Sequence, residues 1–348
     1  MDQTQLKIGL KVTLQILIQF ACLSFTAWQS FNCVQKYFDW PQASSIRLVD
    51  KINALGPSYA ICPYDPKDGF NLTILQNCGI EYEDYVQGTF SSPNCPDPKI
   101  LIESLVLNSQ DILANITAKN SFTDLNYSLP IKDLERIDDP NNCYLLDLAN
   151  DLDIDDIEIE FRLENIDVHV FTHGTFFDSY SYEEIDLKLE HKDVALGYDV
   201  IDSLNTQDHP CEPDKHYKKD NCVWDEIHQS SLEQFGCTTP FGPKKSNICL
   251  NQTLGQNAIE LLNQMRIPAN NRCLDPCTTV VPYLSIIARE QNSKSSSLSL
   301  KLPRKIKVMS SYLSYKVLSL IAEIGGYVGL FLGVSILDLK NILNFIFE

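Results

Sequence analysis

The chain has 348 residues and a formal net charge of −18 at pH 7. So few cationic side chains cannot neutralise phosphates at scale, which excludes nucleic-acid binding as the main activity. The length allows one large domain or two smaller ones besides any membrane segments. An acidic surface attracts cations but can equally be a soluble, self-repelling exterior. The acidic run at residues 151–160 could attract cations or simply be a solvated surface. A third interpretation is a proton sensor, in which two close carboxylates share a proton.

The first apolar stretch covers residues 10–31, with Lys7 and Lys11 at its start. Its length suits a membrane helix of roughly 20 residues. A cleaved signal peptide is the alternative, with the two lysines as its charged region. The stretch is long for a signal peptide, however, and no small-x-small cleavage site follows it. We therefore predict a retained transmembrane helix at 10–31 and a cytoplasmic segment at 1–9.

The middle of the chain carries the signs of an extracellular domain. Of the 12 cysteines, all but Cys22 and Cys33 lie between residues 62 and 277. The same region contains four Asn-x-Ser/Thr sequons, at Asn71, Asn115, Asn126 and Asn251. Together they indicate an oxidising, glycosylating compartment. We predict an extracellular domain at 32–314, both termini in the cytoplasm and residence in the plasma membrane.

The predicted extracellular domain is of mixed α+β class. Residues 155–170, 185–189 and 297–308 alternate apolar and polar side chains, the pattern of half-buried strands, and Pro303 predicts an edge or bend in the last of them. A helix is expected from a capping box at Thr253 to Ile267-Pro268, and a weaker one at 225–235. Six cysteines surround these helices, and spacing alone allows fifteen pairings.

No catalytic motif is present, so the sequence supports no enzyme class, and no cofactor is expected. A zinc site at Cys273 and Cys277 is a weak alternative to disulfides in an oxidising compartment. His169 and His173 are four residues apart and could share a strand face. No acidic residue completes a known metal pattern beside them, so no metal site is predicted.

The second apolar stretch, Val317 to Leu337, differs from a simple anchor. It contains Glu323, although an intramembrane carboxylate is costly. Gly325, Gly329 and Gly333 form a small-xxx-small ridge, which permits close packing of helices. Helix dimerisation would be enough to explain the glycine spacing. The Gly-x-Ser at 333–335 could in addition turn oxygens toward an ion path, and we therefore predict a transmembrane pore helix at 315–339.

These residues resemble the degenerin/epithelial sodium channel superfamily, which includes acid-sensing and peptide-gated channels. The segment from Tyr315 to Leu337 is similar to the second membrane segment of that family, with its acid, Gly-Gly, Gly-Leu-Phe and Gly-x-Ser. Support comes from Cys273-Leu-Asp-Pro-Cys277 with Tyr283, from Tyr37-Phe-Asp-Trp-Pro41 and from Pro57-Ser-Tyr-Ala-Ile-Cys62. The resemblance is weakest between residues 64 and 200.

The resemblance implies a sodium-selective, amiloride-sensitive channel, assembled as a homo- or heterotrimer with related subunits. Its ectodomain would have a β-sheet palm and a disulfide-stapled helical thumb at about 209–283. The implied filter is Gly333, Val334 and Ser335, with Glu323 at the pore mouth, Ser319 at the degenerin gating position, and Gly325, Gly326 and Gly329 in helix packing. The predicted disulfides are Cys62–Cys143, Cys78–Cys95, Cys211–Cys277, Cys222–Cys273 and Cys237–Cys249.

The sequence also departs from the family pattern. The family's cytoplasmic His-Gly element has no counterpart, because Ile8-Gly9 stands in its place. The family usually has an acidic residue just after the filter, at about the position of Asn341, and here Asp338 and Lys340 occupy that neighbourhood. Residues 340–348 are expected to be a short cytoplasmic end. The alternatives are a non-conducting surface subunit that binds a partner and a secreted binding protein. The gating stimulus and any extracellular ligand are not specified.

Overall fold

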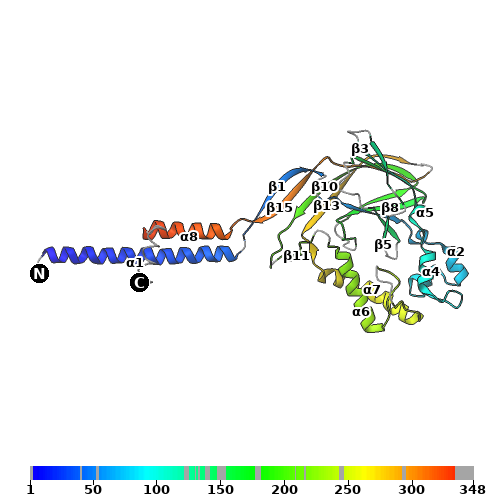
Figure 1. Cartoon of the computed structure of the whole chain (residues 1–348), viewed down its shortest axis with the longest axis horizontal. Helices are drawn as coiled ribbons and strands as arrows, with labels where there is room; N and C mark the ends of the chain where they lie inside the picture. The colour runs from blue at the N-terminus through cyan, green and yellow to red at the C-terminus, as the bar shows by residue number, and fades with distance from the viewer. Residues whose placement is uncertain are drawn as a thin grey trace. The chain divides into compact units, whose positions relative to one another are not determined.

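The computed structural model describes residues 3–39, 41–51, 55–120, 125–129, 131, 134–137, 142–146, 154–176, 182–207, 209–214, 217–242, 247–291 and 295–333. The chain divides into two compact units (Figure 1). The first, here called the helical unit, combines residues 1–45 with 311–348. The second, the sheet unit, contains residues 46–310.

The helical unit consists of α1 (Gln3–Phe38) and α8 (Val317–Leu332), which lie side by side (Figure 1). The Phe25 and Phe331 rings meet edge to face with centroids 4.9 Å apart. Where the two chain segments leave the helices, the Ser314 backbone N–H donates to the Pro41 carbonyl at 2.9 Å. No helix within the described residues is both long enough and apolar enough to qualify as a membrane span.

An eight-stranded sheet is organised around the long strand β10 (Glu190–Asp202). β10 pairs antiparallel with β13 along one side and parallel with β14 and β15 along the other. The order is β1-β15-β10-β14-β7-β3-β4. The other strands are β1 (Gln42–Asp50), β3 (Leu113–Asn120), β4 (Leu125–Ser128), β7 (Asp156–Phe161), β13 (Thr278–Gln291), β14 (Ser297–Lys301) and β15 (Lys305–Leu313).

A second sheet of five antiparallel strands has the order β5-β6-β2-β8-β9. Its strands are β2 (Ser58–Pro63), β5 (Glu135–Ile137), β6 (Cys143–Leu146), β8 (Asn165–Phe171) and β9 (Glu183–Lys188). The two sheets share one apolar core, to which Ile61 and Val168 contribute from this sheet and Ile159 and Leu298 from the larger one. Alternation of apolar and polar residues therefore turns one face of each sheet inward.

The strand predictions agree with the structure, with one refinement. The alternating run at 155–170 forms two strands, β7 and β8, and these belong to different sheets. The run at 297–308 is divided at Pro303 into β14 and β15. Proline cannot donate to a ladder, so the chain bends there before it pairs again.

The helices of the sheet unit form two groups. One group contains the 3₁₀ turn η2 and the short helices α2 to α5: η2 (Pro66–Gly69), α2 (Leu72–Cys78), α3 (Tyr82–Val86), α4 (Pro98–Leu105) and α5 (Ser109–Ile112). The other, here called the helical lobe, contains α6 (Lys219–Phe235) and α7 (Gln252–Arg272), with the short pair β11 (Cys211–Glu212) and β12 (Asp275–Pro276). Aromatic side chains of both groups pack in one core, including Tyr85, Phe90 and Phe241.

Three helix boundaries differ from the predictions. The weaker helix, predicted at 225–235, begins at Lys219. The prediction that Ile267-Pro268 ends the helix is wrong, because α7 continues to Arg272. An interior proline costs roughly 3 kcal/mol, and the last turn is held against that cost by the fully buried Ala269 and by the disulfide at Cys273. The cap is also not at Thr253. Asn251 precedes the helix, and its side chain accepts from the Thr253 and Leu254 backbone N–H groups.

The two groups of helices touch through their backbones at a pair of glycines. A Cβ atom on Gly255 of α7 would overlap the carbonyl oxygen of Gly88, which follows α3. Gly88 itself has a φ of +115°, in the region that favours glycine. Neither position tolerates a larger residue without separating the helices.

Replacing Gly255 with alanine should therefore destabilise the sheet unit. We expect the free energy of unfolding to fall by about 1–3 kcal/mol, the range for overpacking. Asn257→Ala, an exposed substitution on the same helix, is the matched control for helix propensity. Thermal unfolding of the purified chain measures both. Equal melting temperatures for the two variants would contradict the close contact.

Candidate pore-lining helix

The carboxylate of Glu323 on α8 is held by three groups of the helical unit. The Tyr315 hydroxyl donates to Glu323 Oε2 at 2.6 Å, and the Tyr327 hydroxyl donates to Oε1 at 3.4 Å. The Lys36 ammonium of α1 lies 3.5 Å from Oε2 and 4.3 Å from the centroid of the Tyr315 ring. Glu323 therefore fixes one face of α8 toward α1.

The side chains of α8 divide into two faces at 100° per residue. The half-buried face is formed by Leu320, Glu323, Ile324, Tyr327, Val328 and Phe331. The exposed face contains Ser319, Ala322, Gly325, Gly326, Gly329 and Gly333. No atom lies within 4 Å of where a Cβ on Gly325 or Gly326 would be. The four glycines and the predicted gating residue Ser319 thus lie on the face of α8 that points away from α1.

The helix ends where the predicted filter begins. Gly333 adopts a left-handed conformation with φ 66° as the C-terminal cap, and its N–H donates to the Gly329 carbonyl at 3.1 Å. A left-handed cap redirects the backbone out of the helix, and glycine adopts it without steric cost. Val334 and Ser335 lie outside the described residues, as does the predicted cytoplasmic end at 340–348.

Glu323 is the one predicted pore residue that the structure places on a different face. Its carboxylate points to Lys36 and the two tyrosines. Around the helix it lies about 160° from Gly325 and about 120° from Gly329, but only about 60° from Gly326. The sequence pattern gave no sign of Lys36, because it comes from the other end of the chain, whereas Tyr327 follows Glu323 by one helical turn. The pore-mouth role of Glu323 stays a prediction, and the geometry adds an anchoring role.

Five disulfides join Cys62–Cys143, Cys78–Cys95, Cys211–Cys277, Cys222–Cys273 and Cys237–Cys249. These are the pairs that the resemblance implies. Two of the disulfides close the base of the helical lobe, one inside the other. Cys211, before α6, pairs with Cys277, after α7. Cys222, in the first turn of α6, pairs with Cys273, the residue that follows α7. Cys273 and Cys277 therefore do not form the zinc site weighed above.

The two histidines considered as metal ligands do not converge. His169 stands opposite Glu184 on β9 and its ring contacts Phe176 and Tyr182. His173 lies beyond the end of β8, and its Nδ1 is 3.1 Å from the Ser58 hydroxyl. No group of three or more His, Cys, Asp or Glu side chains in the described part of the chain has the arrangement of a metal site.

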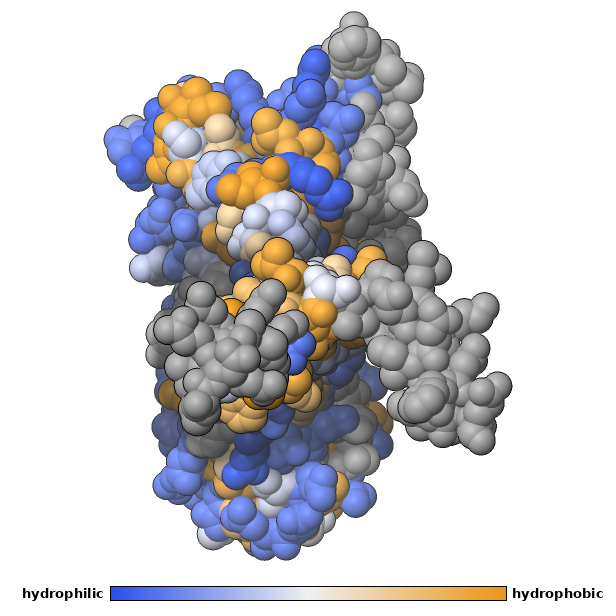
Figure 2. All heavy atoms as spheres, turned by 90° about the vertical axis from the view of Figure 1, so that its left-hand side faces the viewer, coloured by the Kyte–Doolittle hydropathy of each residue, from blue (hydrophilic) through white to orange (hydrophobic). Residues whose placement is uncertain are grey.

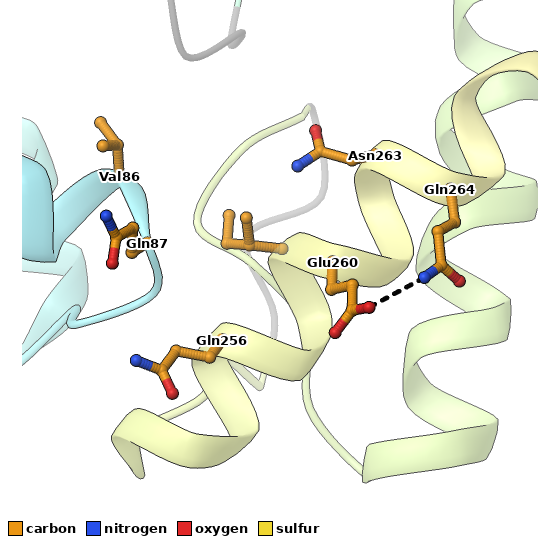
Figure 3. Close-up of a pocket in the computed structure, with 7 residues that line it drawn as sticks. Val86, Gln87, Gln256, Glu260, Asn263 and Gln264 are labelled. Carbon is orange, nitrogen blue, oxygen red and sulfur yellow. Dashed lines mark hydrogen bonds between the residues drawn. The ribbon is translucent and has the colours of Figure 1, made fainter.

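A shallow cleft of about 530 Å³ lies between the end of α3 and the exposed face of α7 (Figure 3). Its lining is mostly amide side chains, and Gln264 donates to Glu260 at 3.0 Å. Glu260 is the single carboxylate among the lining residues. The cleft therefore contains no carboxylate pair that could share a proton. The lining residues are Val86, Gln87, Gln256, Ile259, Glu260, Asn263 and Gln264.

A titratable group that sequence reasoning missed is Asp167 on β8. It stands directly opposite Asp186 of β9, with Glu184 two residue pairs further along. Burial, followed by the charges of Glu184 and Asp186, raises the pKa of Asp167 to about 6, while Lys188 and Lys192 act in the opposite direction. Two strands distant in sequence must pair before these carboxylates meet, so alternation alone could not reveal them.

Asp167→Asn should stabilise the chain at neutral pH and remove a pH dependence. The folded-state pKa lies above the ordinary value of 3.8, so the folded protein loses stability as pH rises from there to about 6. The asparagine variant should melt at a higher temperature than the wild type at neutral pH, and at the same temperature at about pH 4. Glu103→Gln, an exposed carboxylate of α4, is the control. A constant difference at all pH values would contradict the assignment.

Residues 190–345 match the family model described as the amiloride-sensitive sodium channel. No curated protein matches the chain. A solved structure, described as a cryo-EM structure of a proton-activated chloride channel, is 7% identical to it, with a TM-score of 0.34. The match covers 97% of this chain and 99% of that one, but at that score it carries no weight for function. The family is one of ion channels, which supports the non-enzyme prediction. Over residues 190–345, a little under half of its length, the chain is therefore similar to the amiloride-sensitive sodium channel family.

Proposed function

We propose that the chain is a subunit of a sodium-selective, amiloride-sensitive cation channel of the plasma membrane, with a trimeric pore lined by α8. The family match supports this because it extends from β10 through the helical lobe to α8 and the residues that follow it. The permeant ion would be sodium, and copies of this chain or related subunits would complete the trimer.

The division of α8 into two faces is the observation that carries the proposal. Glu323, Tyr327 and Phe331 engage the α1 side, so α1 covers only that side. The opposite side carries the small residues, which allow close approach of another helix or of an ion path. A helix that served only as an anchor would gain nothing from Gly325, Gly326 and Gly329 in its interior, each costing about 1 kcal/mol relative to alanine.

The end of α8 supports a constriction at 333–335. α8 ends at the left-handed Gly333, and an unwound backbone at 334–335 would let carbonyl oxygens turn toward a central axis. Open backbone at membrane depth is tolerated where it borders a water-filled path. In this proposal the Ser335 hydroxyl and the carbonyls nearby replace part of the hydration shell of a sodium ion.

Exposed apolar side chains support membrane insertion of both helices in the proposed channel. On α1 these include Ile16, Leu17 and Phe20, and on α8 they include Leu318 and Leu330. Hydrophobic residues are visible at the surface among hydrophilic ones in Figure 2. The five disulfides support an oxidising, extracellular location for residues 46–310.

A non-conducting surface subunit is the second candidate, and the state of Glu323 favours it. A carboxylate that is paired with Lys36 and accepts from two tyrosines has less negative charge to offer passing cations. Such a chain could assemble with conducting relatives without forming a pore by itself.

Expression in a cell line with whole-cell recording separates the two candidates. We expect a sodium current that amiloride blocks, and Gly329→Leu should reduce it by about tenfold or more because the small-residue face is filled. Leu330→Ile, at the next residue of the helix, is the matched control and should leave the current unchanged. Surface biotinylation must show equal amounts of each variant. A current unaffected by Gly329→Leu would contradict the pore assignment, and no current from surface trimers would favour the second candidate.

A further inference from the structure

We propose that N-linked glycans are attached at Asn71 and Asn251, whereas Asn115 remains unmodified. The sequence offers four sequons and does not distinguish among them. The structure does so through the exposure and the local geometry of each acceptor. This inference rests on the extracellular position proposed for residues 46–310.

The two proposed acceptors occupy the same position relative to a helix. Asn71 immediately precedes α2 and Asn251 immediately precedes α7, and the threonine of each sequon is the second residue of the helix that follows. All four side chains, Asn71, Thr73, Asn251 and Thr253, are exposed. A sugar attached at either asparagine would therefore extend into solvent without displacing a neighbouring element.

The cap at Asn251 is compatible with a sugar on the same side chain. Its Oδ1 accepts from the Thr253 N–H at 2.9 Å and from the Leu254 N–H at 3.3 Å. A glycan is attached through Nδ2, which takes no part in these two bonds. The cap therefore holds the side chain in one orientation and leaves the modified atom outside it.

Exposed leucines stand beside both acceptors. Leu250 is 65% exposed and Leu254 is 37% exposed next to Asn251, and Leu72 is 38% exposed next to Asn71. The first sugar of an N-glycan has an apolar face as well as hydroxyl groups. Placed on these leucines, it would shield apolar surface that the protein itself leaves in water.

Asn115 has a different environment. It lies on β3 between a bulge and Ile116, is half-buried, and stands opposite Glu160 of β7. Thr117 of the same sequon is half-buried as well, and it borders a polar hollow of the sheet with Glu158 and Lys119. A sugar at Asn115 would have to lie across this row of side chains. The side chain of Asn126, on β4, is outside the described residues.

The inference also limits where partners can bind. Glycans at the starts of α2 and α7 keep those two surfaces in solvent. The contacts between subunits of the proposed trimer must then use other surfaces.

The test uses the full chain expressed in cells and separates the glycan from the cap. Thr253→Ala removes the sequon and keeps Asn251 as the helix cap. Asn251→Asp keeps a capping oxygen but lacks the amide nitrogen to which a glycan is attached. Thr253→Ser keeps both the sequon and the cap. We expect the first two variants to lose one mobility step on a gel and the serine variant to lose none. Thr73→Ala should lose a second step, and Thr117→Ala should lose none. Digestion with an N-glycosidase and mass spectrometry of the peptides identify each occupied asparagine.

The outcomes separate this inference from the proposed function. A glycan at Asn115, or its absence at Asn71 or Asn251, overturns the inference while leaving the extracellular location in place. Complete absence of carbohydrate, together with free thiols at the paired cysteines, overturns the extracellular location as well. The sodium current is recorded independently of both results, so a glycosylated chain without current contradicts only the channel proposal.

Discussion

The ion pair and hydrogen bonds of Glu323 determine which face of α8 meets α1. One carboxylate in an otherwise apolar helix needs partners, and it finds them in a tyrosine before the helix, a tyrosine one turn later and a lysine from the other end of the chain. The Tyr327 bond lies within α8 and turns with it, whereas the Lys36 contact joins α8 to α1. Rotation of α8 about its axis would therefore break the Lys36–Glu323 pair. The glycines are thereby directed to the opposite side, where they have open space around them.

The sheet unit depends on a different constraint, the closure of its parts by covalent bonds and backbone contact. Cys62–Cys143 joins neighbouring strands of the smaller sheet, while the disulfides at Cys211 and Cys222 close the helical lobe at its base. A disulfide typically contributes about 2–4 kcal/mol by restricting the unfolded chain. The contact of Gly88 with Gly255 then sets the distance between the lobe and the short helices.

Local patterns predicted much of this fold. Alternation located β7, β8, β14 and β15, and Pro303 marked the break between the last two, because side-chain periodicity follows from strand geometry itself. Contacts between distant segments were not predictable in this way. Lys36 and Glu323 are 287 residues apart in number, and Asp167 meets Asp186 only after β8 and β9 pair. The helix end predicted at Pro268 was wrong for the same reason, because burial of the last turn of α7 outweighs the local cost of the proline.

The region that matches the channel family is also a structural whole. It begins at the first residue of β10 and contains every strand that pairs directly with β10, together with the helical lobe and α8. The unmatched residues before it supply the smaller sheet and the short helices, which pack on this frame through a shared core. The match also leaves out α1, although α1 packs directly on α8 through Phe25 and Phe331. Residues outside the match therefore contribute to the packing of the sheet unit and of the helical unit alike.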